Sequence, residues 1–238
     1  MKIRLFTIPN ILTLSNLACG SIALIEILLY QNFVSAFILI IAAAAFDFLD
    51  GMSARLLNQY SKLGVELDSL ADIISFGVVP SMAMFTLFNI SPKGIDCQTW
   101  SMYGAYITLL IGCFSALRLA RFNIDDEQKE SFIGLPTPAN ALFCLSLSLL
   151  VSMGKLTLSA ECVAITSVVM ALLLISPLKL FALKFKEFSW TKNKVRYIFL
   201  ILAAATLVIC KEYALPVIVA IYILTSIASN IIESAKTK

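Results

Sequence analysis

The residues best suited to chemistry are four aspartates that fall within one stretch of 26 residues. Asp47 and Asp50 are three residues apart, so a helix presents both on one face. Asp68 and Asp72 are four residues apart and share a helix face in the same way. If the chain reverses near residues 59–60, an antiparallel hairpin puts Asp47 level with Asp72. Asp50 then lies level with Asp68, and we expect the four carboxylates to converge within two helical turns.

Carboxylates held this close together predict a bound cation. They repel strongly in poorly screened surroundings, and the neighbouring Arg55 alone cannot neutralise four of them. Ligand sets made only of carboxylate oxygens favour the divalent ions Mg²⁺ and Mn²⁺, and a pair of such ions is a known device for phosphoryl chemistry. An isolated aspartate would be explained equally well by a helix cap or an ion pair, but that explanation does not account for a cluster. We predict a divalent-metal site formed by Asp47, Asp50, Asp68 and Asp72.

The sequence contains no histidine. Nucleophiles activated by histidine and metals bound by histidine are therefore excluded. The chemistry must come from carboxylates, from basic residues or from a metal with oxygen ligands.

The elements that must position these carboxylates are membrane helices. Of 238 residues, 60% are hydrophobic and 14% are charged, and the mean hydropathy is +0.92, whereas a soluble domain is about half apolar and a quarter charged. A bilayer core of about 30 Å takes roughly 20 apolar residues as a helix. Candidate spans lie near residues 11–30, 33–56, 66–88, 101–122, 136–153, 160–182, 195–210 and 213–232. We predict an all-α, polytopic transmembrane helical bundle of about eight spans, with residues 1–238 as a single domain.

The basic residues are distributed unevenly between the two ends of these spans. If the N-terminus is cytoplasmic, the opposite side holds only Lys93, Lys155 and Lys211. The cytoplasmic ends and loops hold Lys2, Arg4, Arg55, Lys62, Arg118, Arg121, Lys129, Lys179, Lys184, Lys186, Lys192, Lys194, Arg196, Lys236 and Lys238. This bias predicts a protein of the cytoplasmic membrane with both termini and the active site facing the cytoplasm. Pro9 and Asn10 interrupt the first apolar run, which we expect to remain as a helix rather than to be cleaved as a signal peptide.

The aspartates belong to a longer pattern, Asp-x-x-Asp-Gly-x-x-Ala-Arg, eight residues, Gly, three residues, Asp, three residues, Asp. Its specified positions are Asp47, Asp50, Gly51, Ala54, Arg55, Gly64, Asp68 and Asp72. The run resembles the signature of the CDP-alcohol phosphatidyltransferase family at every one of these positions. The resemblance implies an enzyme that moves a phosphatidyl group from a CDP-linked lipid to a small alcohol. CMP would leave by direct displacement, without a covalent enzyme intermediate.

The resemblance also implies roles for single residues. Two divalent ions would be bound by the aspartates and bridged to the CDP diphosphate. Asp72 would in addition be the catalytic base that takes the proton of the acceptor hydroxyl. The CDP-lipid would be bound by Gly51, Ala54, Arg55 and Gly64. A homodimer is expected from the same resemblance.

Polar residues also follow one side of the first apolar stretch. Asn10, Thr13, Asn16 and Gly20 fall within an arc of about 120° at 100° per residue. A polar arc on a membrane helix should face protein or a wet cavity. We assign Asn10 and Thr13 to the CDP-lipid headgroup, and hydrogen bonding between helices explains the arc equally well.

Two further segments bear on the acceptor. Arg118, Arg121 and Asn123 end the fourth apolar stretch, and a second run at 134–141 contains Thr137. A guanidinium group matches a carboxylate or a phosphate with two hydrogen bonds. Helix anchoring by the positive-inside rule and a proline-led helix start explain these segments equally well. They resemble the same region of membrane-integral family members that act on CDP-diacylglycerol and L-serine, which implies an acceptor site of Arg118, Arg121, Asn123 and Thr137.

Other functions remain open at this point. Within the family, glycerol 3-phosphate or inositol phosphate could replace serine, as could choline or ethanolamine. From a different class, a cation-coupled membrane transporter also places carboxylates in the membrane. A transporter would carry them nearer the midplane, with inverted repeats and broken helices, which the sequence does not show.

Overall fold

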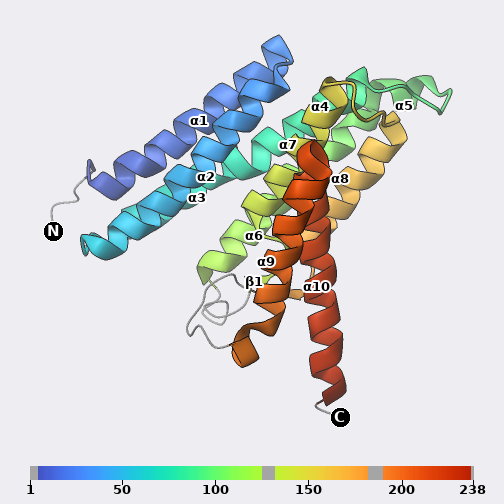
Figure 1. The fold of residues 1–238 in the computed structure, drawn as a ribbon. Helices are drawn as coiled ribbons and strands as arrows, with labels where there is room; N and C mark the ends of the chain where they lie inside the picture. The colour runs from blue at the N-terminus through green and yellow to red at the C-terminus, as the bar shows by residue number, and fades with distance from the viewer. Residues whose placement is uncertain (1–4, 125–131, 182–189, 237–238) are drawn as a thin grey trace.

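The computed structural model describes residues 5–124, 132–181 and 190–236, and it confirms an all-α fold (Figure 1). The α-helices are α1 (Ile8–Tyr30), α2 (Phe33–Leu56), α3 (Lys62–Asp72), α4 (Val79–Ile90), α5 (Gln98–Tyr103), α6 (Leu110–Ile124), α7 (Thr137–Ser152), α8 (Ala160–Ile175), α9 (Trp190–Cys210) and α10 (Ala214–Lys236). Shorter elements are the π-helix η1 (Ile73–Val78), the 3₁₀ helices η2 (Gly104–Leu109) and η4 (Lys211–Tyr213), and the two-residue strands β1 (Phe132–Ile133) and β2 (Lys179–Leu180).

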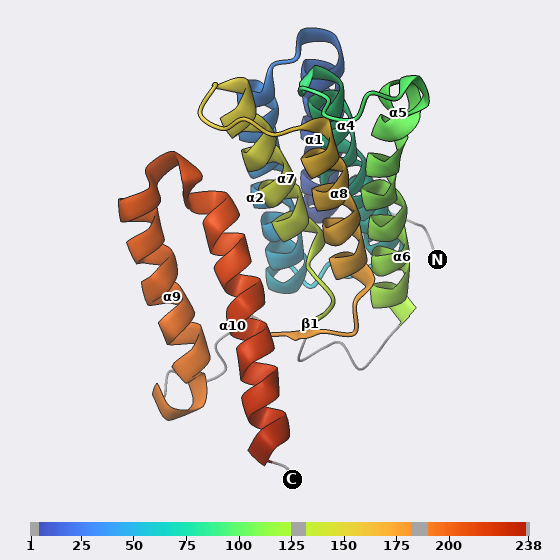
Figure 2. The same cartoon turned by 90° about the vertical axis from the view of Figure 1, so that its right-hand side faces the viewer.

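Several helices have the length and composition of membrane spans. Within the described residues, five helical stretches are long and apolar enough to cross a membrane, at 8–30, 33–56, 62–90, 98–124 and 194–230. Two shorter apolar helices, α7 and α8, accompany them. The stretch 194–230 covers most of α9 and α10, which fold back on each other at η4 and lie at one side of the remaining helices (Figure 2).

Helices α1 and α2 form a tight hairpin that carries much of one half of the core. The turn between them uses Gln31 in the left-handed conformation, with a φ of 50°, and Asn32, whose side-chain oxygen accepts from the Ser35 N–H to cap α2. Ala23, Ala36 and other small residues are fully buried where the two helices meet. Small side chains allow helix backbones to approach closely in a membrane, so this hairpin is a firm support for the residues at the end of α2.

The chain reverses between α2 and α3 where the sequence predicted it. Asn58 takes a left-handed conformation with a φ of 51°, and the Ser61 hydroxyl accepts from the Gly64 N–H at 2.9 Å to begin α3. Five residues, Leu57 to Ser61, separate the two helices. The aspartates of α2 and α3 are therefore carried on adjacent antiparallel segments at the same end of the bundle.

The helical stretch 62–90 is continuous but contains a π-helical segment. Residues 73–78 form a π-helix between α3 and α4, and the Val79 N–H bonds to the Ile74 carbonyl, five residues back. Pro80 follows at once and has no N–H to bond to the carbonyl of the preceding turn. A π segment next to a proline is a common way to absorb such a missing bond, and it turns the residues before it relative to those after it.

The sixth predicted span, 160–182, is too long. Helix α8 ends at Ile175, and Ser176 is extended, with a ψ of 150°. Pro177 follows Ser176, and the residue before a proline is disfavoured in the helical region. The chain beyond it pairs β2 antiparallel with β1, placing Phe132 opposite Leu180. Gly134, with a φ of 79°, makes the turn from β1 toward α7.

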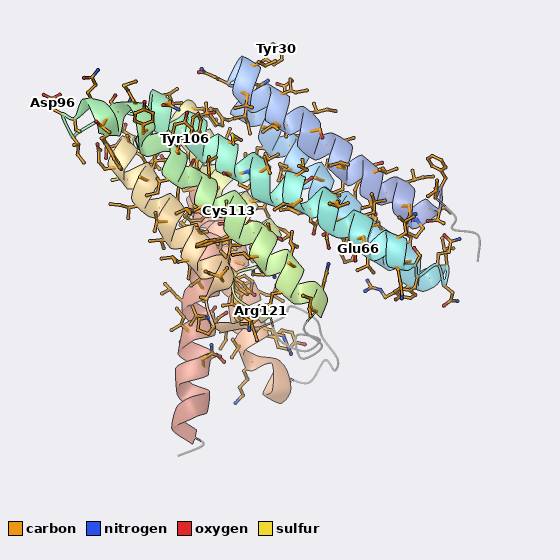
Figure 3. All side chains as sticks on the ribbon, turned by 180° about the vertical axis from the view of Figure 1, so that it is seen from behind. Tyr30, Glu66, Asp96, Tyr106, Cys113 and Arg121 are labelled. Atoms are coloured by element: carbon orange, nitrogen blue, oxygen red, sulfur yellow. The ribbon has the colours of Figure 1, made fainter. Side chains whose placement is uncertain are left out.

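The two ends of the bundle differ in what they carry. Figure 3 shows Tyr30, Asp96 and Tyr106 toward one end and Glu66 and Arg121 toward the other. The end with Glu66 also holds the α2–α3 turn. Of the basic residues used to predict orientation, Lys2, Arg4, Lys129, Lys184, Lys186 and Lys238 lie outside the described residues.

Candidate active site

Three of the four aspartates form a compact carboxylate cluster. Asp47 and Asp50 on α2 and Asp68 on α3 each offer an oxygen, and these three oxygens lie within 4.8 Å of one another. Ligand oxygens in an octahedral shell at about 2.1 Å from Mg²⁺ are about 3 to 4 Å apart. The Asp68 Oδ1 atom is buried and has no hydrogen-bond partner among the described residues, which leaves it available as a metal ligand.

Asp72 lies beside this cluster but is held differently. Its Oδ1 accepts a hydrogen bond of 3.0 Å from Asn16 Nδ2 on α1. Its side chain is 8% exposed, and it is close enough to Asp47 and Asp68 to interact with them electrostatically. The sequence placed all four carboxylates together, whereas the structure groups three and turns the fourth toward α1.

The polar arc of α1 faces the aspartates. Thr13 Oγ1 donates to Asp50 Oδ2 at 2.6 Å, and Asn16 donates to Asp72 as described above. Asn10, Thr13, Asn16 and Gly20 are all buried. Hydrogen bonding between helices, one of the two explanations left open by the sequence, accounts for Thr13 and Asn16. Asn16 was not among the predicted site residues, and its position one turn after Thr13 was the available signal.

A cavity of about 200 Å³ opens next to the carboxylate cluster, and we call it the α1–α3 cavity. It is lined by Pro9, Asn10, Thr13, Asp50, Gly51, Ala54, Gln59, Tyr60, Ser61, Gly64, Val65 and Asp68. Most of the residues predicted to bind the CDP-lipid therefore share one cavity. Gln59, Tyr60 and Ser61 were missed, because the turn between α2 and α3 carries no recognisable motif.

The glycines at this cavity differ in their surroundings. A Cβ added to Gly51 would meet no atom within 4 Å, so the space in front of it is open. A Cβ on Gly64 would lie 3.4 Å from Asn10 Oδ1, so α3 approaches α1 closely there. Arg55 is exposed and does not line the cavity. Of the residues predicted to bind the CDP-lipid, Arg55 is therefore the one that does not line the α1–α3 cavity.

Of the four predicted acceptor residues, Arg118 is linked to Thr137 and to Arg121, whereas Asn123 contacts α3. Arg118 on α6 is buried and donates to Thr137 Oγ1 on α7 at 3.4 Å. Arg121 is exposed near the end of α6 (Figure 3). Together with Arg118 it borders a separate cavity of about 250 Å³ whose other walls are aliphatic. Asn123 is exposed as well and donates to Ser69 Oγ on α3 at 2.8 Å.

Arg118 is the acceptor candidate nearest to the aspartates. It interacts electrostatically with Asp72, but no ion pair joins the two within the part of the chain that the structure describes. Its only hydrogen bond to a described residue is the one to Thr137. A buried guanidinium with so few partners is suited to bind an anionic group.

The sequence matches known proteins. The sequence profile of CDP-alcohol phosphatidyltransferases matches residues 6–227. A Bacillus subtilis (strain 168) protein named CDP-diacylglycerol–serine O-phosphatidyltransferase is 40% identical over 144 residues, which are 59% of this chain and 75% of that protein. A Methanocaldococcus jannaschii protein of the same name is 35% identical over 176 residues, 74% of each chain. One from Helicobacter pylori (strain J99) is 40% identical over 140 residues, but the match spans just over half of its length, 55%.

These matches define the class of the protein. It is an integral membrane protein with several apolar helices, built around an acidic cluster able to hold a metal ion. The chain belongs to the CDP-alcohol phosphatidyltransferase family.

Proposed function

We propose that this enzyme transfers the phosphatidyl group of CDP-diacylglycerol to L-serine, giving phosphatidylserine and CMP. The names of relatives at 35 to 40% identity support serine as the acceptor. The structural observation that carries the proposal is the buried Arg118. It donates a hydrogen bond to Thr137 and interacts electrostatically with Asp72. Serine offers a carboxylate for the arginine and a hydroxyl for the aspartate.

The reaction is a single displacement at phosphorus. The serine hydroxyl oxygen forms a bond to the phosphorus that bears the diacylglycerol. The bond from that phosphorus to the oxygen of CMP breaks, and CMP leaves with the electron pair. Asp72 takes the hydroxyl proton, and because Asn16 bonds to its Oδ1, the second carboxylate oxygen remains for this task. Holding hydroxyl and phosphorus together removes much of the entropic barrier.

Metal binding is assigned to the carboxylates of Asp47, Asp50, Asp68 and Asp72. Two ions, Mg²⁺ or Mn²⁺, would supply charge stabilisation to the diphosphate as the bond to CMP breaks. Thr13 fixes one of these carboxylates by its hydrogen bond to Asp50 Oδ2. A hydrogen bond of this kind restricts the rotation of the carboxylate and orients it toward a bound metal ion.

The α1–α3 cavity is proposed as the place of the CDP headgroup. It adjoins the carboxylate cluster through Asp50 and Asp68, which line it. The open space in front of Gly51 leaves room for the nucleotide, and Ala54 keeps the next turn of the wall small. Asn10, Thr13 and Gly64 complete the assigned contacts, and Arg55 is proposed to reach the phosphates from the rim.

The wider organisation follows from the same reasoning. We take residues 1–238 as one domain with eight spans, counting α9 and α10 as separate spans and including α7 and α8. An even number puts both termini on one side, and the positive-inside rule makes that side the cytoplasm. The active site then faces cytosolic serine. A homodimer is proposed from the family resemblance.

An acceptor panel with purified protein tests this function. CDP-diacylglycerol and a divalent ion are supplied with L-serine, glycerol 3-phosphate, inositol phosphate or ethanolamine, and the lipid products are identified by mass spectrometry. Phosphatidylserine as the main product is the expected result. A lipid product formed mainly from glycerol 3-phosphate, inositol phosphate or ethanolamine would assign the enzyme another acceptor within the family. Absence of CMP release with every acceptor would favour a transporter.

Variants of the two arginines refine the test. Truncating one partner of a buried, hydrogen-bonded charge pair costs roughly 2 to 5 kcal/mol, or about 30-fold or more in affinity. Arg118→Ala should therefore raise the serine KM by at least that factor with little change for CDP-diacylglycerol. Arg118→Lys should recover only part, because lysine keeps the charge and loses the planar fork. Arg121→Ala, at an exposed position, should have the smaller effect. Equal losses for both substrates would assign Arg118 to the lipid phosphates.

A further inference from the structure

A group of buried polar side chains continues inward from Arg118, away from the helix ends. Ser115 precedes Arg118 by one turn of α6, and Asn140 follows Thr137 by one turn of α7. Ser115 and Asn140 are fully buried, at 0% exposure each. We call Ser115, Arg118, Thr137 and Asn140 the α6–α7 polar group.

The helix geometry places Ser115 and Asn140 deeper in the bundle than Arg118 and Thr137. Helices α6 and α7 run in opposite directions along the bundle, and Arg118 donates to Thr137 near the end of α6 and the start of α7. Ser115 lies one turn back on α6 and Asn140 one turn forward on α7, so both lie further from these helix ends. The π-helix η1 packs here too, because a Cβ on Gly77 would lie 3.0 Å from Ser115 Cβ.

Three polar atoms of this group have no partner within the described residues. They are Ser115 Oγ, Arg118 Nε and Asn140 Nδ2, all buried. Other buried serines nearby behave differently: Ser148 on α7 donates to the Cys144 carbonyl of its own helix at 2.9 Å, and Ser167 on α8 donates to the Val163 carbonyl at 2.8 Å. The usual intrahelical bond is therefore not what Ser115 makes.

The chemistry of the unpaired atoms selects their ligand. Arg118 Nε and Asn140 Nδ2 can only donate, and the hydroxyl of Ser115 can donate as well. Buried polar groups in folded proteins nearly always have partners, so several unpaired donors around one guanidinium indicate a ligand rich in acceptors. A carboxylate has two oxygens with about four acceptor positions and a charge that complements arginine.

We propose that Ser115 and Asn140, together with Arg118, bind the carboxylate of the amino-acid acceptor and so determine that a carboxylate-bearing alcohol is chosen. The inference rests on the proposed function, and it extends the acceptor site to two residues that lie one turn deeper than the arginine. Arg118, one member of the group, interacts electrostatically with Asp72, the proposed base. A serine bound by its carboxylate at this depth directs its hydroxyl back toward Asp72.

The test compares serine with ethanolamine, which is serine without its carboxylate. Asn140→Leu and Ser115→Ala are measured with both acceptors, and the KM for CDP-diacylglycerol is recorded for each variant. Each lost donor should raise the serine KM roughly 10- to 100-fold, the range for a hydrogen bond to a charged group. The KM for CDP-diacylglycerol should stay unchanged, and so should the rate of any reaction with ethanolamine. Ser148→Ala is the matched control, since it removes an equally buried hydroxyl from α7.

The outcomes separate the inference from the function beneath it. A wild-type chain that makes no phosphatidylserine would refute the proposed function. Wild-type synthesis of phosphatidylserine with an unaltered serine KM in both variants would overturn the inference alone. If buried water fills the group, the variants lower the thermal unfolding midpoint and leave discrimination between serine and ethanolamine intact, which also overturns it. Should Asn140→Leu fail to fold, Ser115→Ala decides, because it removes a single atom beside Gly77.

Discussion

Replacing Thr13 by valine should impair the metal site although Thr13 is not itself one of the proposed metal ligands. Valine has nearly the same shape as threonine but cannot donate a hydrogen bond, so the packing of α1 against α2 is kept. The change removes the hydrogen bond of 2.6 Å from Thr13 Oγ1 to Asp50 Oδ2, in a buried setting. Asp50 then has more rotational freedom and must be ordered again when a metal binds.

The size of the effect follows from that one contact. A hydrogen bond to a charged group contributes about 1.5 to 3 kcal/mol, which corresponds to roughly 10- to 150-fold in an equilibrium constant. Loss of an outer partner of a metal ligand lowers metal affinity or activity by about 10- to 100-fold in other metalloproteins, which agrees. We therefore expect Thr13→Val to raise the Mg²⁺ or Mn²⁺ concentration needed for half-maximal activity by about 10- to 100-fold.

The assay is CMP release from CDP-diacylglycerol as a function of metal concentration. Thr13→Ser keeps the hydroxyl and should retain most of the wild-type metal affinity. Ser15→Ala is the control on the same helix, because Ser15 is only half-buried and donates to the Ile11 carbonyl of its own helix. An unchanged metal dependence in Thr13→Val, or an equal shift in Ser15→Ala, would refute the view that Thr13 positions a metal ligand.

Three further changes test other parts of the structure. Asp68→Ala should lower metal-dependent turnover by more than about 100-fold while the protein still inserts into the membrane, since it removes a proposed ligand; near-normal turnover would exclude Asp68 from the site. Tyr60→Cys, in a chain without its native cysteines, should be labelled from the cytoplasmic side only, and labelling from outside alone would reverse the orientation. Gly134→Ala should lower the free energy of unfolding by roughly 1 to 3 kcal/mol, which is measured as a lower thermal unfolding midpoint in detergent. Its φ is 79° and a Cβ would lie 2.2 Å from the Leu174 carbonyl oxygen, so an unchanged midpoint would contradict the local geometry.

The hairpin that carries the aspartates could be predicted because its constraints are local. Apolar stretches of fixed length put the reversal between α2 and α3 near residues 59–60, and helical spacing then aligned Asp50 with Asp68. The structure has its turn at Leu57 to Ser61 and brings Asp47, Asp50 and Asp68 together. The all-α fold followed in the same way from composition.

The features that escaped prediction depend on which helices pack together. Asn16 was recognisable as part of a polar arc, but its partner Asp72 lies 56 residues away on another helix. The π segment before Pro80 was missed because the apolar pattern continues through it without a break. The end of α8 was misplaced for a similar reason, since the residues after Pro177 remain largely apolar while the backbone has already turned extended.

Whether the aspartates of α2 and α3 carry out phosphatidyl transfer is tested most directly by measuring CMP and phosphatidylserine together in one reaction. Purified wild-type protein with CDP-diacylglycerol, L-serine and a divalent ion should give the two products in equal amounts, and removing the metal with a chelator should stop both. Asp72→Asn, which keeps the size of the side chain and can still bond to Asn16, should form neither product at more than a small fraction of the wild-type rate. Formation of phosphatidylserine at the wild-type rate by Asp72→Asn, or by wild-type protein in chelator, would contradict a metal-dependent displacement assisted by this carboxylate.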